Sequence, residues 1–154
     1  MEIEPIFYAK TVYGKEEVDA VVKCLSESTQ MGFYSRNFEK KIAELFNKEH
    51  CLYTNSGSSA LYLGIESLNL PEGSEVITPS LTFSTTVASL VKNKLVPIFI
   101  DVEPTSYCID HNQIEENISK KTKAILAPNL LGNLCNWPVI KKIADKYNLI
   151  IIED

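Results

Sequence analysis

Leu52–Leu61 reads LYTNSGSSAL, and this stretch decides how the rest of the chain is organised. It begins as a short apolar strand, breaks into small polar residues, and resumes as an apolar run with helical spacing. Such a strand–turn–helix junction directs several backbone N–H groups toward one point, where the helix dipole adds partial positive charge. The junction therefore favours a phosphate group. An ordinary βα loop, in which a serine caps the helix, is the alternative.

Apolar runs alternate with helical patterns from residue 50 to the end of the sequence. We expect strands at 51–54, 75–78, 95–100, 123–127 and 149–153, and helices at 58–69, 83–93, 110–119 and 136–147. Continuous apolar strands separated by single helices predict βαβ crossovers. The sequence therefore predicts an α/β fold with a mostly parallel sheet, covered by helices on both faces.

The first 49 residues have a different pattern. Residues 1–13 show no periodicity, 14–28 have a helical apolar stripe, and Ser35 is the expected N-cap of a second helix after a loop at 29–34. We therefore predict an N-terminal arm with two helices over 1–49. The first part of an incomplete α/β domain is predicted over 50–154.

Composition excludes several classes of function. The 154 residues carry a net charge of −5 with 45% apolar residues, which is typical of a globular protein and argues against a nucleic-acid surface. No apolar run reaches the ~18 residues of a membrane span, and the N-terminus has no signal-peptide pattern, so we expect a cytoplasmic protein. The four cysteines are too far apart for the usual zinc spacings or a small disulfide framework, and we expect no metal.

Three features fall at strand ends, where ligands bind in parallel sheets. The Gly57-Ser58-Ser59 turn offers an anion site, Phe83 offers a flat ring face, and Asp154 offers a carboxylate. Core packing is the alternative role of Phe83, and a helix cap or a solvated chain end that of Asp154. Together the three features match the phosphate, ring and ring nitrogen of pyridoxal 5'-phosphate (PLP), whose ring acts as an electron sink.

Motifs along nearly the whole chain carry a family resemblance: Gly32 with Phe38-Glu39, then Thr54–Leu61, Gly73–Phe83, Pro97–Val102, Leu131–Asn133, and Ala144–Tyr147 leading to Ile152–Asp154. Their order and spacing resemble the DegT/DnrJ/EryC1/StrS family of nucleotide-sugar aminotransferases, which have fold type I of the PLP enzymes. The resemblance implies that Gly57, Ser58 and Ser59 hold the cofactor phosphate. It further implies that Phe83 stacks on the pyridine ring and that Asp154 pairs with its nitrogen.

The same resemblance implies a nucleotide-linked keto sugar and an amino donor as substrates, and a homodimer. It places the Schiff-base lysine beyond Asp154, so we assign no catalytic residue within these 154 residues. We expect a fragment truncated before that lysine and inactive alone. A chain that truly ended there would leave an exposed strand edge prone to aggregation.

Two residues in the loop after the strand at 123–127 are candidate substrate contacts, Asn129 and Asn133. Asn129 stands where the commoner family pattern has a histidine. Leu131-Gly132-Asn133 is more similar to the branch of 3-dehydratases that act on 4-keto-6-deoxy sugars with pyridoxamine 5'-phosphate (PMP). Aminotransferase is the first hypothesis and dehydratase the second.

A third hypothesis, from another class, is a non-catalytic flavodoxin-like binding module. The stretch Thr54–Ser59 also resembles a flavin phosphate loop and follows the first strand of the alternating region. The two preceding helices, and the presence of Phe83 and Asp154, argue against it.

Overall fold

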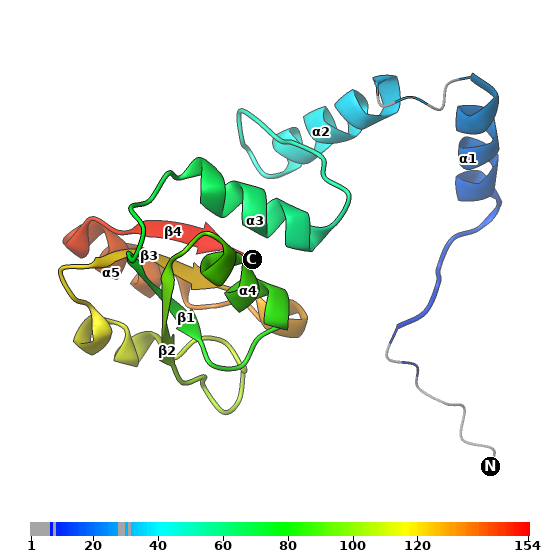
Figure 1. Ribbon diagram of the computed structural model, residues 1–154. Helices are drawn as coiled ribbons and strands as arrows, with labels where there is room; N and C mark the ends of the chain where they lie inside the picture. The colour runs from blue at the N-terminus through cyan, green and yellow to red at the C-terminus, as the bar shows by residue number, and fades with distance from the viewer. Residues whose placement is uncertain (1–6, 8, 28–29, 31) are drawn as a thin grey trace, which may run out of the picture. The chain divides into compact units, whose positions relative to one another are not determined.

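The computed structural model describes residues 7, 9–27, 30 and 32–154 (Figure 1). The chain divides into two compact units, Met1–Tyr53 and Thr54–Asp154. The first unit contains helices α1 (Lys15–Glu27) and α2 (Phe33–Leu45). The predicted arm at 1–13, the end of the helix predicted at 14–28 and the loop predicted at 29–34 fall partly outside the described residues.

Helix α2 begins earlier than predicted, and the assignment of Ser35 as its N-cap is wrong. The helix starts after Gly32, whose carbonyl accepts a hydrogen bond from the N–H of Arg36 at 3.0 Å. Phe33 and Tyr34 meet edge to face with ring centroids 5.4 Å apart, and the Tyr34 hydroxyl donates to Glu27. These contacts hold both aromatic residues in helical conformation, so Ser35 lies inside the first turn.

The strand predicted at 51–54 does not form. The N–H of Tyr53 donates to the Glu39 carboxylate at 2.9 Å, and its ring packs edge-on against Phe38 with centroids 5.5 Å apart. A strand needs a neighbouring strand to accept its backbone hydrogen bonds. Here a side chain of α2 takes the N–H of Tyr53, and the apolar pattern alone does not produce a ladder.

The second unit contains a four-stranded sheet in which every pairing is parallel, as predicted. Its strands are β1 (Glu75–Pro79), β2 (Val96–Ile100), β3 (Thr122–Ala127) and β4 (Ile150–Glu153). Their spatial order is β2-β1-β3-β4. Because all four strands run in one direction, their carboxyl ends lie at one edge of the sheet. This edge is where the sequence places its candidate ligand residues.

Helices cover both faces of this sheet, which confirms the predicted fold class. They are α3 (Gly57–Ser67), α4 (Ser84–Lys92) and α5 (Trp137–Tyr147). Successive residues of a strand point to opposite faces. In β1, Val76 packs in a core with Ile65 of α3 and Leu90 of α4, whereas Ile77 packs in a second core with Ile140 of α5. These side chains are almost completely buried, and each contributes about 2 kcal/mol by leaving water.

The helix predicted at 110–119 is instead two short 3₁₀ turns, η1 (His111–Gln113) and η2 (Glu115–Asn117). Asp110 caps the first turn, accepting from the N–H of Asn112 at 3.0 Å. A third 3₁₀ turn, η3 (Leu130–Gly132), follows β3. In the part of the chain that the structure describes, no helix combines the length and apolarity needed to cross a membrane.

Candidate functional site

The N-terminus of α3 combines a capped turn with open N–H groups. Ser56 precedes the helix and its Oγ accepts from the N–H of Ser59 at 3.1 Å. Among the described residues, the N–H groups of Gly57 and Ser58 have no acceptor. Apart from its chain neighbours and the backbone of its own helix, no heavy atom lies within 4 Å of the position that a Cβ on Gly57 would occupy. A serine cap and an anion site are therefore compatible here, because the cap uses one N–H and leaves two at the positive end of the helix.

Phe83 presents its ring to solvent. It is the residue immediately before α4, has an extended backbone (φ −68°, ψ 141°), and its carbonyl accepts from the N–H of Thr86 at 3.0 Å. The residue is 70% exposed, although a phenylalanine normally contributes to a core. The ring is therefore not part of a core in the described unit, and its exposed face is free to stack on a flat ligand.

Asp154 follows β4 and is fixed through both its backbone and its side chain. Its N–H donates to the carbonyl of Ala127 at 3.1 Å, and its carbonyl accepts from the N–H of Asn129 at 2.9 Å. Its Oδ2 accepts from the hydroxyl of Thr86 at 2.7 Å, which ties the end of β4 to the first turns of α4. In Figure 1 the end of the chain lies close to α4, consistent with this bond.

Helices α3 and α4 pack against each other, and a cleft of about 260 Å³ lies between them. Ser58 and Ser59 line it from α3, and Thr85, Ser89 and Lys92 are among the residues that line it from α4. The predicted phosphate turn therefore lies beside the α4 segment that follows Phe83 and contains Thr86. Lys92 adds a positive charge to the same cleft.

Asn129 makes several contacts that organise its own loop. Its Nδ2 donates to Glu153 at 2.6 Å, while its Oδ1 accepts from the N–H of Cys135 and from the indole N–H of Trp137, both at 3.1 Å. One N–H of the side-chain amide has no partner among the described residues, and it remains available to a ligand.

Asn133 lies at the end of the same loop with an exposed side chain. Its carbonyl accepts from the thiol of Cys108 at 3.3 Å. Leu131 and Gly132, just before it, have positive φ values of 56° and 85°. A left-handed backbone at an exposed leucine is unusual and occurs mainly where the surrounding structure imposes it, often near functional sites.

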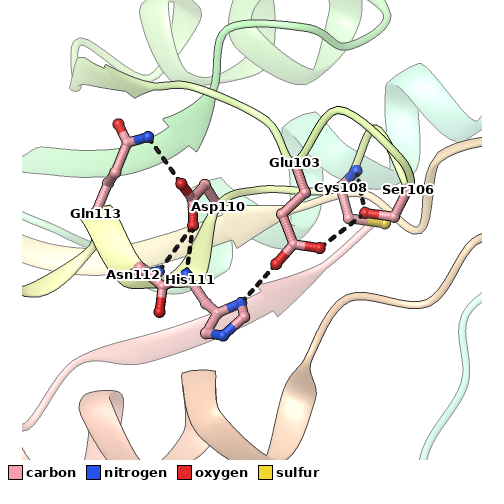
Figure 2. A network of polar contacts seen from close by, with 7 residues as sticks. All are labelled: Glu103, Ser106, Cys108, Asp110, His111, Asn112 and Gln113. Carbon is pink, nitrogen blue, oxygen red and sulfur yellow. Dashed lines mark hydrogen bonds and ion pairs between the residues drawn. The ribbon is translucent and has the colours of Figure 1, made fainter.

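Figure 2 shows a polar network on the loop between β2 and β3. Glu103 accepts from Ser106 at 3.1 Å and lies 2.9 Å from Nδ1 of His111, while Asp110 accepts from both Asn112 and Gln113. The bond from Gln113, more than those from Asn112, holds the pKa of Asp110 below its usual value. Both carboxylates already accept hydrogen bonds within the network. We therefore interpret this network as a structural one that stabilises the loop.

The thiols of Cys108 and Cys135 are buried in the core beneath α5. Burial, reinforced by the neighbouring Cys108, raises the pKa of Cys135 to about 12. Such a thiol stays protonated at neutral pH and is a poor nucleophile.

Two site residues were missed by reasoning from the sequence. Thr86 contacts the Asp154 carboxylate directly, and Thr82 donates to the Thr86 hydroxyl at 3.0 Å. Thr82 lies just before α4 and Thr86 in its first turn, and the presence of hydroxyl residues around a helix start was the available signal. The partner of Thr86, however, lies 68 residues away.

The chain is similar to known proteins along nearly its whole length. The family model of the DegT/DnrJ/EryC1/StrS aminotransferase family matches residues 12–154. Over 152 residues the chain is 40% identical to lipopolysaccharide biosynthesis protein RfbH of Salmonella typhimurium, covering 93% of this chain and 35% of that protein. It is also 34% identical to GDP-perosamine synthase of Escherichia coli O157:H7, covering 96% of this chain and 41% of the relative.

Solved structures share the fold. The Escherichia coli GDP-4-keto-6-deoxy-D-mannose-3-dehydratase with bound hydrated PLP superimposes with a TM-score of 0.90 at 32% identity, over 95% of this chain and 39% of that one. The aminotransferase from Psychrobacter cryohalolentis superimposes with a TM-score of 0.89 at 30% identity, over 97% of this chain and 38% of that one. The chain thus spans well under half the length of these relatives and has the fold type I architecture. It belongs to the DegT/DnrJ/EryC1/StrS aminotransferase family.

Proposed function

We propose that the whole protein is a PLP-dependent aminotransferase that transfers an amino group to a nucleotide-linked keto sugar. The observation that carries this proposal is the combination, in one unit, of an open helix N-terminus, an exposed aromatic ring and a fixed carboxylate. Biosynthesis of a deoxyamino sugar for a cell-surface polysaccharide or a secondary metabolite is the corresponding role. The names of relatives such as RfbH and GDP-perosamine synthase support it.

The residues fit the cofactor at three points. The N–H groups of Gly57 and Ser58, with the hydroxyls of Ser58 and Ser59, would hold the phosphate at the positive end of α3. The exposed face of Phe83 would support the pyridine ring. Asp154 would keep a proton on the ring nitrogen, because a carboxylate beside a pyridinium favours its charged form. When bound, the cofactor supplies an electron sink for amino transfer.

In this proposal Asn129 and Asn133 contact the sugar substrate. The remaining amide N–H of Asn129 and the exposed side chain of Asn133 are the groups that support it. The protein acts as a cytoplasmic homodimer, and its Schiff-base lysine lies beyond Asp154. The 154 residues alone therefore do not catalyse transamination, and measurable turnover by them would contradict this part of the proposal.

A second candidate function is PMP-dependent removal of a hydroxyl group from a 4-keto-6-deoxy sugar. It is favoured by the resemblance of Leu131-Gly132-Asn133 to that branch, and by solved relatives whose names identify them as 3-dehydratases. In that branch a histidine replaces the Schiff-base lysine. The residue at that position in the complete coding sequence separates the two functions.

The test of the function uses the complete gene product, purified in the presence of PLP. We expect a bound-cofactor absorbance band and thermal stabilisation by added cofactor, both weakened in the Asp154→Asn variant. Incubation with a keto sugar nucleotide and glutamate should yield an amino sugar, detected by mass spectrometry. A product that has lost a hydroxyl would favour the dehydratase. A yellow flavin spectrum, with no response to PLP or PMP, would instead support a flavodoxin-like module.

A further inference from the structure

The side chain of Asp154 lies at the end of a chain of two hydroxyl groups. A carboxylate can only accept hydrogen bonds, so the hydroxyl hydrogen of Thr86 must point toward Oδ2, 2.7 Å away. The Thr86 oxygen is then free to accept, and it does so from the hydroxyl of Thr82 at 3.0 Å. Both hydroxyl orientations are therefore determined by the charge at Asp154.

Thr86 is well placed to hold this geometry against competition from water. It is only 1% exposed, whereas Asp154 is exposed and Thr82 is intermediate. A threonine in a helix has few rotamers, and Thr86 belongs to the first turn of α4. A hydrogen bond from a buried, stiff donor to an ionised acceptor is stronger than one between neutral groups.

We propose that Thr86 is the positioning residue for the Asp154 carboxylate, with Thr82 orienting the Thr86 hydroxyl. This inference rests on the proposed function, in which Asp154 pairs with the pyridine nitrogen of the cofactor. The backbone hydrogen bonds of Asp154 fix its Cα, and the bond from Thr86 fixes the rotation of the side chain. Oδ2 is thus engaged, and Oδ1 has no hydrogen-bond donor among the described residues, so it would be open to the ring nitrogen.

The consequence is a site organised before the cofactor arrives. Without the hydroxyl of Thr86, the exposed Asp154 side chain samples other rotamers and hydrates. Binding must then order it again, which weakens the pairing with the cofactor. Loss of one hydrogen bond to a charged group corresponds to about a tenfold weaker affinity.

The experiment compares variants of the complete gene product for binding of PMP labelled with nitrogen-15 in its ring. Two quantities are measured, the dissociation constant and the ring-nitrogen chemical shift, which reports its protonation. In Thr86→Val we expect about tenfold weaker binding and a shift toward the unprotonated ring. Thr86→Ser keeps the hydroxyl and should restore both quantities to near the unmodified values.

The matched control is Thr122→Val. Thr122 is also a buried threonine whose hydroxyl donates to a carboxylate, that of Glu75 at 3.3 Å, but it begins β3 at the other edge of the sheet. Its loss should leave both quantities unchanged. If Thr86→Val behaves like this control, the inference is overturned. If Thr86→Val fails to fold, Thr82→Val provides the test, with weaker binding expected and unchanged binding overturning the inference.

The Asp154→Asn variant distinguishes a failure of this inference from a failure of the proposed function. If Asp154→Asn changes neither the dissociation constant nor ring protonation, the proposed function is wrong at this site. If Asp154→Asn changes both while Thr86→Val changes neither, the function stands and only the role of Thr86 is refuted.

Discussion

Replacing Asn129 by alanine tests how the loop after β3 is held. The side chain of Asn129 connects three parts of the second unit: Glu153 at the end of β4, the backbone of Cys135, and the indole of Trp137 in α5. Alanine removes all three hydrogen bonds while retaining the Cα and Cβ. We therefore expect the Asn129→Ala chain to be clearly less stable than the original chain, whether or not a ligand is present.

The magnitude follows from the environment of each bond. The two bonds accepted by Oδ1 of Asn129 are half-buried and neutral, and each contributes about 1 kcal/mol to stability. The bond to Glu153 is exposed to solvent, and such bonds contribute little because water replaces the partner. We expect a loss of about 2 kcal/mol, or roughly 30-fold in the unfolding equilibrium.

The assay is urea unfolding, followed both by circular dichroism and by the fluorescence of the single tryptophan, Trp137. Asn133→Ala is the matched control, because that side chain is exposed and the hydrogen bonds of Asn133 are made by its backbone atoms. It should change the unfolding free energy by less than about 0.5 kcal/mol. A loss of that small size in Asn129→Ala would refute the role of this side chain in holding the loop.

Three further predictions concern single side chains, each measured by urea unfolding of the chain. Ser56→Ala removes the cap of α3 and should lower the unfolding free energy by about 1 kcal/mol. Ser56→Asn should retain most of the stability that the cap provides, and equal stability of the two variants would contradict the role of the cap. Thr78→Val should keep the unfolding free energy or raise it by up to about 1 kcal/mol, because the buried Thr78 hydroxyl has no hydrogen-bond partner among the described residues. A clear loss of stability would contradict this and would mean that the hydroxyl does have a hydrogen-bond partner. Because hydrogen bonding lowers the pKa of Asp110 in the folded chain, the unfolded chain binds the proton first as the pH falls. The stabilisation by Asp110 is therefore complete above the unfolded-state pKa and is lost as the pH falls through the folded-state pKa. The stability advantage of the original chain over Asp110→Asn should thus shrink on acidification below about pH 4, and an advantage independent of pH would contradict it.

Periodicity was sufficient to predict most of the second unit. Strands such as β1 and β3 are continuous apolar runs between turn residues, and a segment of this kind is stable only when both of its faces are covered. The stripe of α5, which buries Ile140 and Ile143, was recognisable for the same reason. These elements follow from where apolar side chains fall along the chain, which is local information.

Predictions failed where the outcome depended on a distant partner. The stretch 51–54 has the apolar character of a strand, yet no neighbouring strand in the described residues accepts its hydrogen bonds, and Tyr53 bonds to Glu39 instead. Likewise, Asp110 caps the start of a helical segment, but the helix predicted at 110–119 does not form. Two short 3₁₀ turns form in place of one helix.

The candidate site shows the same division. By itself, the sequence determined which residues offer an anion-binding turn, a ring and a carboxylate, because small polar residues, Phe83 and Asp154 stand at the boundaries of recognisable elements. Only the tertiary structure decided that the hydroxyl of Thr86 reaches the Asp154 carboxylate, and that the side chain of Asn129 connects its loop to α5 and β4. A hydrogen bond depends on the separation and direction of two atoms, and for residues far apart in sequence only the packed sheet and helices determine these.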